Sequence, residues 1–240
     1  MKRLVLTVAT VALLGWVTPV QATPIVNGSF DTFVQSGGFL DGNFGGWIRY
    51  FGPPTNTTNT EITGWTIAGQ NGVIPNNVDL VHNLTYPSFT NTAGSNSLDL
   101  EGAVGASGVI FQSFATTSGD TYTLSFEYAN NPMPGPTSSG TMNVLVTGAG
   151  TLLNQNVTHT GSLFTNMNYS LFSQDFVADS TTTTLRFEAL THSGFGIALD
   201  AVSVDLAGTP SPSPVPEPAS LVLLGTGLVA VARRRFKRRA

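Results

Sequence analysis

The sequence predicts an all-β exported domain, built as an antiparallel β-sandwich, with an N-terminal signal helix before it and a short C-terminal apolar helix after it. Three observations favour this fold class. Between the two ends of the chain no long segment has helical periodicity, short runs of β-branched and aromatic residues recur, and clusters of Gly, Pro, Asn and Ser separate them. Seven or more such strands are typical of a sandwich, because each strand must bury one apolar face.

The N-terminus has the pattern of a secretory signal peptide. Lys2 and Arg3 precede an apolar run from Leu4 to Val17, and a small-residue site, Val20-Gln21-Ala22, follows that run. The run is short for a membrane span, and polar, Gly-rich chain begins directly after it. We therefore expect residues 1–22 to be a signal peptide that signal peptidase removes.

Residues 23–207 are the predicted β-sandwich domain. Its clearest strand is TYTLSFEY, in which Tyr122, Leu124, Phe126 and Tyr128 alternate with polar residues, so that one face of the strand is apolar. Weaker alternation predicts further strands at Ser97–Glu101, Val109–Ala115, Met142–Thr147, Ser173–Ala178, Thr183–Ala189 and Ile197–Leu206.

Two irregular stretches interrupt these strands. Residues 36–60 are rich in Gly, Asn and Thr, and residues 130–140 read NNPMPGPTSSG, so both are predicted loops. Loops as long as the first are uncommon in compact domains unless they bind something. Because sugar rings pack on aromatic rings, Trp47 and Tyr50 in this loop are the candidate glycan-binding residues. Trp65 alternates with Ile67 in strand fashion, so we expect it in the core instead.

The C-terminal end of the chain combines a linker, a short apolar stretch and a basic block. Residues 208–215 are rich in Pro and Ser and form a semi-rigid linker. The apolar stretch from Leu221 to Ala232 would be about 18 Å long as a helix, shorter than a hydrocarbon core of about 30 Å. The positive-inside rule keeps the following basic block in the cytoplasm, so we expect the precursor to stay at the inner membrane. This block consists of Arg233, Arg234, Arg235, Lys237, Arg238 and Arg239.

The tail, residues 216–240, resembles the PEP-CTERM sorting signal. The resemblance rests on Pro216, Glu217 and Pro218, on the short apolar stretch and on the terminal basic block. It implies recognition by an exosortase, a membrane-embedded, transpeptidase-like enzyme of exopolysaccharide-producing Gram-negative bacteria. It also implies that the mature protein reaches the cell surface or the extracellular matrix.

The exported domain carries a second resemblance, spread over several blocks. NGSFD at Asn27, ITGWTI at Ile62, VDLV at Val78, SNSLDLEG at Ser95 and GIALDAVSV at Gly196 occur in the order seen in the choice-of-anchor C family. That family is similar to the galactose-binding-like jelly rolls. The last block departs from the family pattern, because an acidic residue and Gly or Pro often precede the Asp of the last strand there.

The resemblance implies a structural calcium site in the exported domain. Its ligands would be the carbonyl of Gly28 and the carboxylates of Asp31 and Asp200. Calcium takes six to eight oxygen ligands, and a domain without disulfides would gain stability from such a clamp. The alternative is that Asp31 caps a turn, while Asp200 pairs with Arg186 or accepts hydrogen bonds from backbone amides.

Composition and motifs narrow the function classes. Only Arg49 and Arg186 oppose the carboxylates of the exported domain, so its acidic surface excludes nucleic acid as an expected partner. The chain has no cysteine, which excludes thiol chemistry. The three histidines lie far apart, and neither H-E-x-x-H nor G-x-S-x-G occurs; they are His82, His159 and His192.

These observations predict a non-catalytic module of the exopolysaccharide matrix that binds glycan. One alternative is a secreted glycoside hydrolase, in which Glu127 and Glu188 lie on the polar sides of predicted strands and meet on one sheet face. Another alternative is a purely structural surface protein, which would bind no glycan.

Overall fold

A computed structural model describes most of the exported domain, and the described residues lie within one compact unit, Thr23–Thr209. The predicted signal helix, linker, C-terminal helix and sorting tail, as well as His192, lie outside the described residues. Within the described part of the chain no helix has the length and apolarity needed to cross a membrane. The described residues are 25–34, 46–52, 59–68, 76–82, 93–102, 108–133, 135, 137–163, 165–191 and 193–207.

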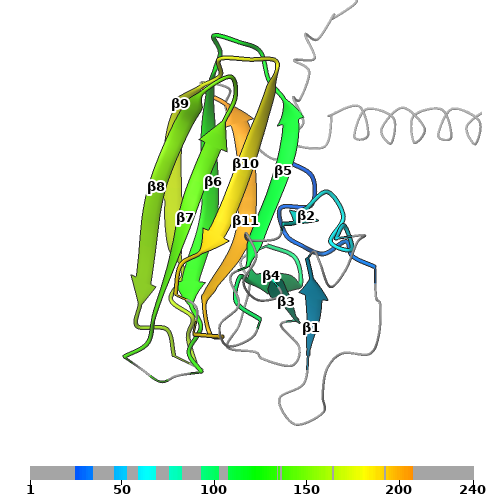
Figure 1. Cartoon of the computed structure of the whole chain (residues 1–240). Coiled ribbons are helices and arrows are strands. Elements are labelled where there is room, and N and C mark those ends of the chain that lie inside the picture. The colour runs from blue at the N-terminus through cyan, green and yellow to red at the C-terminus, as the bar shows by residue number, and fades with distance from the viewer. Residues whose placement is uncertain are drawn as a thin grey trace, which may run out of the picture. The chain divides into compact units, whose positions relative to one another are not determined.

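The described residues form two antiparallel sheets. The first has six strands in the order β1 (Trp47–Phe51), β3 (Asn77–His82), β4 (Asn96–Asp99), β11 (Ile197–Leu206), β6 (Thr121–Asn130) and β9 (Ser170–Val177). The second has five strands in the order β2 (Thr66–Ile67), β5 (Val109–Ala115), β10 (Thr182–Ala189), β7 (Ser139–Thr147) and β8 (Thr151–Thr160). Figure 1 shows both sheets running across the domain, with edge strands β8 and β9 on one side and β1 and β2 on the other.

An aromatic core joins the two sheets. Phe126 on β6 stacks on Phe172 of β9, with ring centroids 4.5 Å apart, and its edge meets Phe187 of β10 at 5.1 Å. Phe187 in turn lies 6.1 Å from the ring of Trp65. Trp65 is 1% exposed, and its indole N–H donates to the Asn27 carbonyl, so the prediction that it belongs to the core is confirmed. Such aromatic pairs stabilise a core beyond the apolar area that they bury.

The predicted all-β antiparallel sandwich is confirmed, and alternation located most of its long strands, though not β8. Strands β5 and β11 have the predicted bounds, and β6 contains the TYTLSFEY stretch. The prediction that residues 36–60 form one loop is wrong, because Trp47–Phe51 is strand β1 within it. Strand β1 pairs along its whole length with β3, and these backbone hydrogen bonds outweigh the turn-forming composition of the flanking chain.

Candidate functional site

The outer face of the six-stranded sheet gathers an indole ring and several polar side chains. On β1, β3 and β4 the alternating apolar residues, such as Ile48, Leu80 and Leu98, pack into the core between the sheets. Because successive side chains of a strand point to opposite faces, the residues between them point outward. We call this set the polar face; it comprises Trp47, Arg49, Asp79, Ser97 and Asp99.

Arg49 links the aromatic and acidic parts of the polar face. Its Nε and Nη2 donate to the two carboxylate oxygens of Asp79, at 2.8 and 2.9 Å, in a bidentate ion pair. Its guanidinium carbon lies 4.6 Å from the ring centroid of Trp47, which is a cation–π contact. The two contacts fix the planes of the guanidinium and indole groups relative to each other.

Asp79 and Asp99 face each other on neighbouring antiparallel strands. Burial raises the pKa of Asp79 to about 7, although the charge and hydrogen bonds of Arg49 oppose that shift. Burial also raises the pKa of Asp99 to about 8, opposed by the hydrogen bond from the Glu101 amide and reinforced by the charge of Asp79. Asp99 accepts a second hydrogen bond, 2.6 Å long, from the side-chain amide of Asn131.

The absence of a side chain at Gly102 permits this packing. A Cβ at that position would lie 2.4 Å from the Asn77 Oδ1 and 2.5 Å from an Asp79 carboxylate oxygen. It would also lie 2.9 Å from the Nε of Arg49. The bidentate pair therefore depends on a glycine just after β4.

The described residues between β8 and β9 are 161–163 and 165–169, and part of this segment lies over the same sheet. The Asn130 amide donates to Nδ1 of His159 at 3.0 Å, so the other ring nitrogen carries the proton and donates to the Asn168 carbonyl at 2.8 Å. These bonds hold the segment in place, and its Met167 packs with Val81 in a small apolar cluster. The remaining members of this cluster are Ala129, Ala198, Trp47 and Tyr169.

Two hydroxyl groups of this region have unused hydrogen-bonding capacity. The Ser97 Oγ and the Tyr169 hydroxyl are both buried and lie close to each other, and neither meets the full geometry of a hydrogen bond with a described residue. Burial raises the pKa of Tyr169, and the nearby charges of Asp200 and Asp99 add to that shift, so its hydroxyl keeps its proton. Tyr169 packs against the same small apolar cluster as Trp47, so its hydroxyl can act as a donor and as an acceptor in the neighbourhood of the indole ring.

The two predicted glycan-binding residues have different environments. Trp47 is half-buried and belongs to the polar face, as just described. The prediction for Tyr50 is wrong, because its ring is 2% exposed and lies in the core, and its hydroxyl donates to the Val34 carbonyl. Burial, followed by the charge of Glu61, raises the Tyr50 pKa to about 12. Being three residues apart on one strand, the two aromatic rings point to opposite faces of the sheet.

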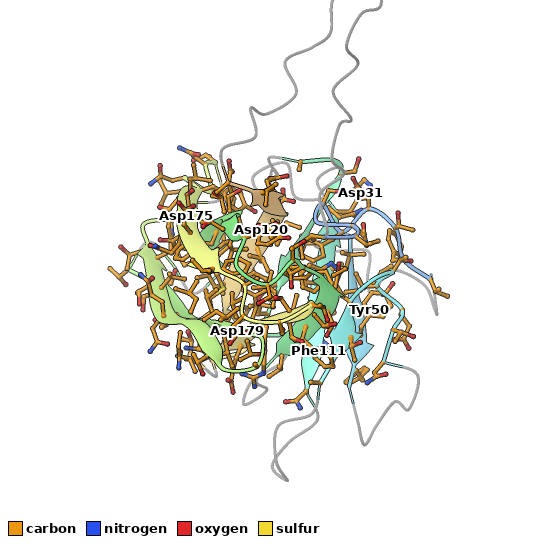
Figure 2. The ribbon with its side chains drawn as sticks, turned by 90° about the horizontal axis from the view of Figure 1, so that it is seen from above. Asp31, Tyr50, Phe111, Asp120, Asp175 and Asp179 are labelled. Carbon is orange, nitrogen blue, oxygen red and sulfur yellow. The ribbon has the colours of Figure 1, made fainter. Side chains whose placement is uncertain are left out.

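Two of the three predicted calcium ligands, Asp31 and Asp200, lie at the turn before β4, and the third, Gly28, lies against the last strand. Asp31 accepts hydrogen bonds from the Ser95 amide at 2.7 Å and from the Asn96 side chain, while Asp200 accepts from the Ala93 amide at 3.1 Å. The Gly28 carbonyl accepts from the Val202 amide of the last strand. Figure 2 shows Asp31 on the N-terminal segment, far from Asp175 and Asp179.

This donor set suits calcium in kind, since every group is an oxygen ligand. At Gly94, in the turn itself, a Cβ would come within 1.6 Å of an Asp31 carboxylate oxygen, so the carboxylate lies directly against the backbone. Within the described ranges, no group of three or more His, Asp and Glu side chains is placed to hold a metal ion. Backbone carbonyls would therefore have to complete the six to eight oxygens, and calcium remains a proposal.

The two glutamates of the hydrolase alternative do not meet. Glu127 lies on β6 and Glu188 on β10, and these strands belong to different sheets. Both side chains alternate with core residues and so point away from the opposite sheet. Glu188 accepts a 2.6 Å ion-pair hydrogen bond from Arg186. Arg186 therefore pairs with Glu188 and not with Asp200, which was the proposed alternative. The prediction that these glutamates share a sheet face is wrong.

Sequence reasoning missed Asp79, Asp99 and Tyr169. A signal for the first two was present, because both occur as a single Asp between apolar residues, in VDL and in LDL. That pattern places the Asp opposite to the buried face of a strand. Nothing local in the sequence indicates that the two strands pair with the aspartates opposite each other.

Comparison with protein-family models gives two matches. The model described as "Protein of unknown function (DUF642)" matches residues 49–205, which is more than half of the chain. The model of the PEP-CTERM protein-sorting motif matches residues 214–239, which confirms the predicted sorting signal and marks the protein as exported. A search of curated proteins finds no match.

Several solved structures are similar to the chain in general form. TmCBM61 in complex with beta-1,4-galactotriose has 10% identity and a TM-score of 0.43, covering 78% of this chain and 99% of that one. A family 16 carbohydrate-binding module has 14% identity and a TM-score of 0.42, covering 75% and 98%. CBM35 from Paenibacillus barcinonensis has 20% identity and a TM-score of 0.37, covering 67% and 99%.

Proposed function

We propose that this chain, which belongs to the DUF642 family, is an exported, non-catalytic module that binds polysaccharide through the polar face of its six-stranded sheet. The observation that carries the proposal is the fixed stack of Trp47 and Arg49, held by Asp79 beside the buried hydroxyls of Ser97 and Tyr169.

The chemistry of the polar face matches that of a sugar ring. A pyranose has apolar C–H groups on its faces and hydroxyls around its rim. A half-buried indole can pack against the C–H groups. Planar side chains with fixed donors and acceptors can bond to the hydroxyls, and binding then orders few side chains. Arg49 is locked by two hydrogen bonds and a ring contact, so the site is organised before ligand arrives.

The same contacts argue against hydrolysis on this face. A hydrolase needs two carboxyl groups that are free to act as acid and as nucleophile or base. The carboxylate of Asp79 is held by Arg49, and Asp99 accepts hydrogen bonds from Asn131 and from the Glu101 amide. Both residues are buried, at 9% and 3% exposure. These acids therefore shape a binding surface.

The sorting signal indicates where the module works. An exported protein with a PEP-CTERM tail meets an exosortase at the inner membrane, and we take that enzyme as the processing partner. The ligand we propose is the exopolysaccharide of the producing Gram-negative cell. Cells carrying the gene with and without residues 216–240 test this step by fractionation. Full-length chain retained in the cytoplasm would contradict it.

The direct test is an array of purified neutral and acidic polysaccharides, probed with the exported chain. Retention on at least one polysaccharide, with no release of reducing sugar over time, is the expected result. Release of reducing sugar would overturn the non-catalytic part of the proposal. Failure to bind any polysaccharide would support the purely structural alternative.

A further inference from the structure

Strand β8 ends its sheet with a free edge. It pairs with β7 on one side, and no other described strand pairs with its second side. The described backbone hydrogen bonds outside the strands do not involve its residues either. In Figure 1 this strand stands at the outermost side of the domain, next to β9. Its outer N–H and C=O groups are therefore available to another strand.

This edge lacks the usual protection against pairing. Exposed edge strands normally carry charges or Pro, or are very short. Strand β8 is 10 residues long and reads TLLNQNVTHT, without Asp, Glu, Lys, Arg, Pro or Gly. The other edges differ, since β1 contains Arg49, β9 contains Asp175, and β2 has only two residues.

We propose that β8 is an interface strand that pairs, antiparallel and edge to edge, with β8 of a second copy of this chain. Antiparallel pairing about a two-fold axis needs a strand that is complementary to itself. An uncharged strand meets that condition, because no like charges are brought together. A two-fold axis at the middle of β8 would place Gln155 opposite Gln155 of the other copy, and the two amide side chains can then bond to each other.

Hydrogen bonds to β7 already order the side chains on one face of β8. The Asn143 side-chain amide on β7 donates to the side chains of Asn154 and Asn156, at 2.7 and 2.8 Å. One row further, the hydroxyls of Thr141 and Thr158 lie 3.0 Å apart. This ladder orders the β8 side chains on the outer face before association, so pairing costs little further side-chain entropy.

The second sheet supports the same contact. Strand β9 is the edge of the six-stranded sheet on the same side of the domain. It carries Leu171 and Val177, which are 66% and 55% exposed. A two-fold axis through the β8 edges would bring the β9 edges of both copies near each other, so that these exposed apolar side chains lie beside the interface. The sorting tail also gathers copies at one membrane, which raises their effective concentration.

Charge variants at Gln155 test the proposal, because this exposed residue lies at the middle of β8. Analytical ultracentrifugation of the exported chain should show a dimer for the wild type. Gln155→Lys and Gln155→Glu should each weaken it by about tenfold or more, through like charges across the axis. An equal mixture of the two variants should restore dimers. A wild type that stays monomeric at every concentration, or a mixture that stays monomeric, would overturn the proposal.

Cysteine cross-linking gives an independent test, since the chain has no cysteine of its own. Gln155→Cys should form a disulfide-linked dimer in the exported protein under mild oxidation, because the two copies of this residue lie opposite each other across the axis. Thr182→Cys is the matched control, because Thr182 is equally exposed on the same sheet but lies on the interior strand β10. Equal cross-linking of both variants would mean random collision and would contradict a β8 interface.

Discussion

The strands of both sheets alternate in the same way, yet the polar residues on the two outer faces of the sandwich differ in burial and in their partners. On the five-stranded sheet, hydroxyl and amide groups bond to one another in exposed pairs, such as Ser113 with Thr184 and Asn143 with Asn154. On the six-stranded sheet, Asp79 and Asp99 are buried beside Arg49. Figure 2 shows Phe111 and Asp175, one from each outer face, on opposite sides of the domain.

The difference comes from what lies over each sheet. The segment that His159 anchors brings Met167 and Tyr169 onto the six-stranded sheet, and burial there raises carboxyl pKa values. Among the described residues of the five-stranded sheet, most outward groups are exposed or half-buried, and all are neutral except the paired Arg186 and Glu188. Alternation thus decides which residues point outward, while packing by distant segments decides which of them become a site.

The largest expected effect is a dependence of stability on pH that comes from one face only. The folded-state pKa of Asp99 is about 8 and that of Asp79 about 7, whereas an unfolded Asp titrates near about 3.9. Both groups hold protons more tightly when folded. Their contribution is therefore complete below about pH 4 and is lost as pH rises towards about 8, on the order of several kcal/mol.

Urea unfolding between pH 4 and 9 measures this effect. The free energy of unfolding of the wild type should fall over that range, and Asp99→Asn should flatten the fall. Asp175→Asn, which changes an exposed carboxyl on the same sheet, should leave the wild-type slope unchanged. Identical profiles for wild type and Asp99→Asn would show that burial of this carboxyl does not set the slope.

The second effect concerns calcium at the turn held by Asp31 and Asp200. A cation that binds only the folded chain stabilises it by about 2.7 kcal/mol at 100 times its dissociation constant. Chelator should therefore lower the melting temperature of calcium-loaded wild type and leave that of Asp31→Asn/Asp200→Asn unchanged. A wild-type melting curve that does not respond to chelator removes Gly28, Asp31 and Asp200 as ligands.

The third prediction is that alanine substitution of two glycines changes stability by different amounts. Gly102→Ala should cost about 2 kcal/mol, because its Cβ would push apart the Arg49–Asp79 pair. Gly150→Ala, in the turn before β8, should be close to neutral, because its Cβ meets an Asp179 oxygen at 3.4 Å, an ordinary contact. Chemical unfolding of both variants decides the point. Similar losses for the two would refute the dependence on Gly102.

The smallest effect is expected on the five-stranded sheet. Asn143→Ala removes two exposed side-chain hydrogen bonds, which water replaces, so the loss should stay within about 0.5 kcal/mol. A loss as large as that of Gly102→Ala would contradict the contrast between the faces.

The sequence predicted most of the strands with clear alternation and missed β1, β3 and β8. Alternation is clear in β5, β6 and β11 because one side of each packs in the core. Strand β3 is buried on both faces and alternates only over the short stretch VDL, and β8 is largely exposed, so it shows no apolar row. A search for alternating apolar and polar residues therefore does not find either strand.

The candidate site was predictable only in part, for a related reason. Trp47 stood out by residue type, but Tyr50 shared that signal and packs in the core. The opposition of Asp79 and Asp99 depends on register between strands, and the cover over them depends on a segment some 70 residues later in the chain. Such pairings are set by tertiary packing, which local pattern does not contain.

The most direct test of the account compares one aromatic residue from each outer face. Trp47 lies on the polar face, and Phe111 is half-buried on the outer side of β5. With a polysaccharide that retains the wild type, Trp47→Ala should weaken binding by about tenfold or more in calorimetric titration. Phe111→Ala should bind like the wild type. Unchanged binding by Trp47→Ala, or loss of binding in Phe111→Ala alone, would contradict a glycan site on the six-stranded sheet.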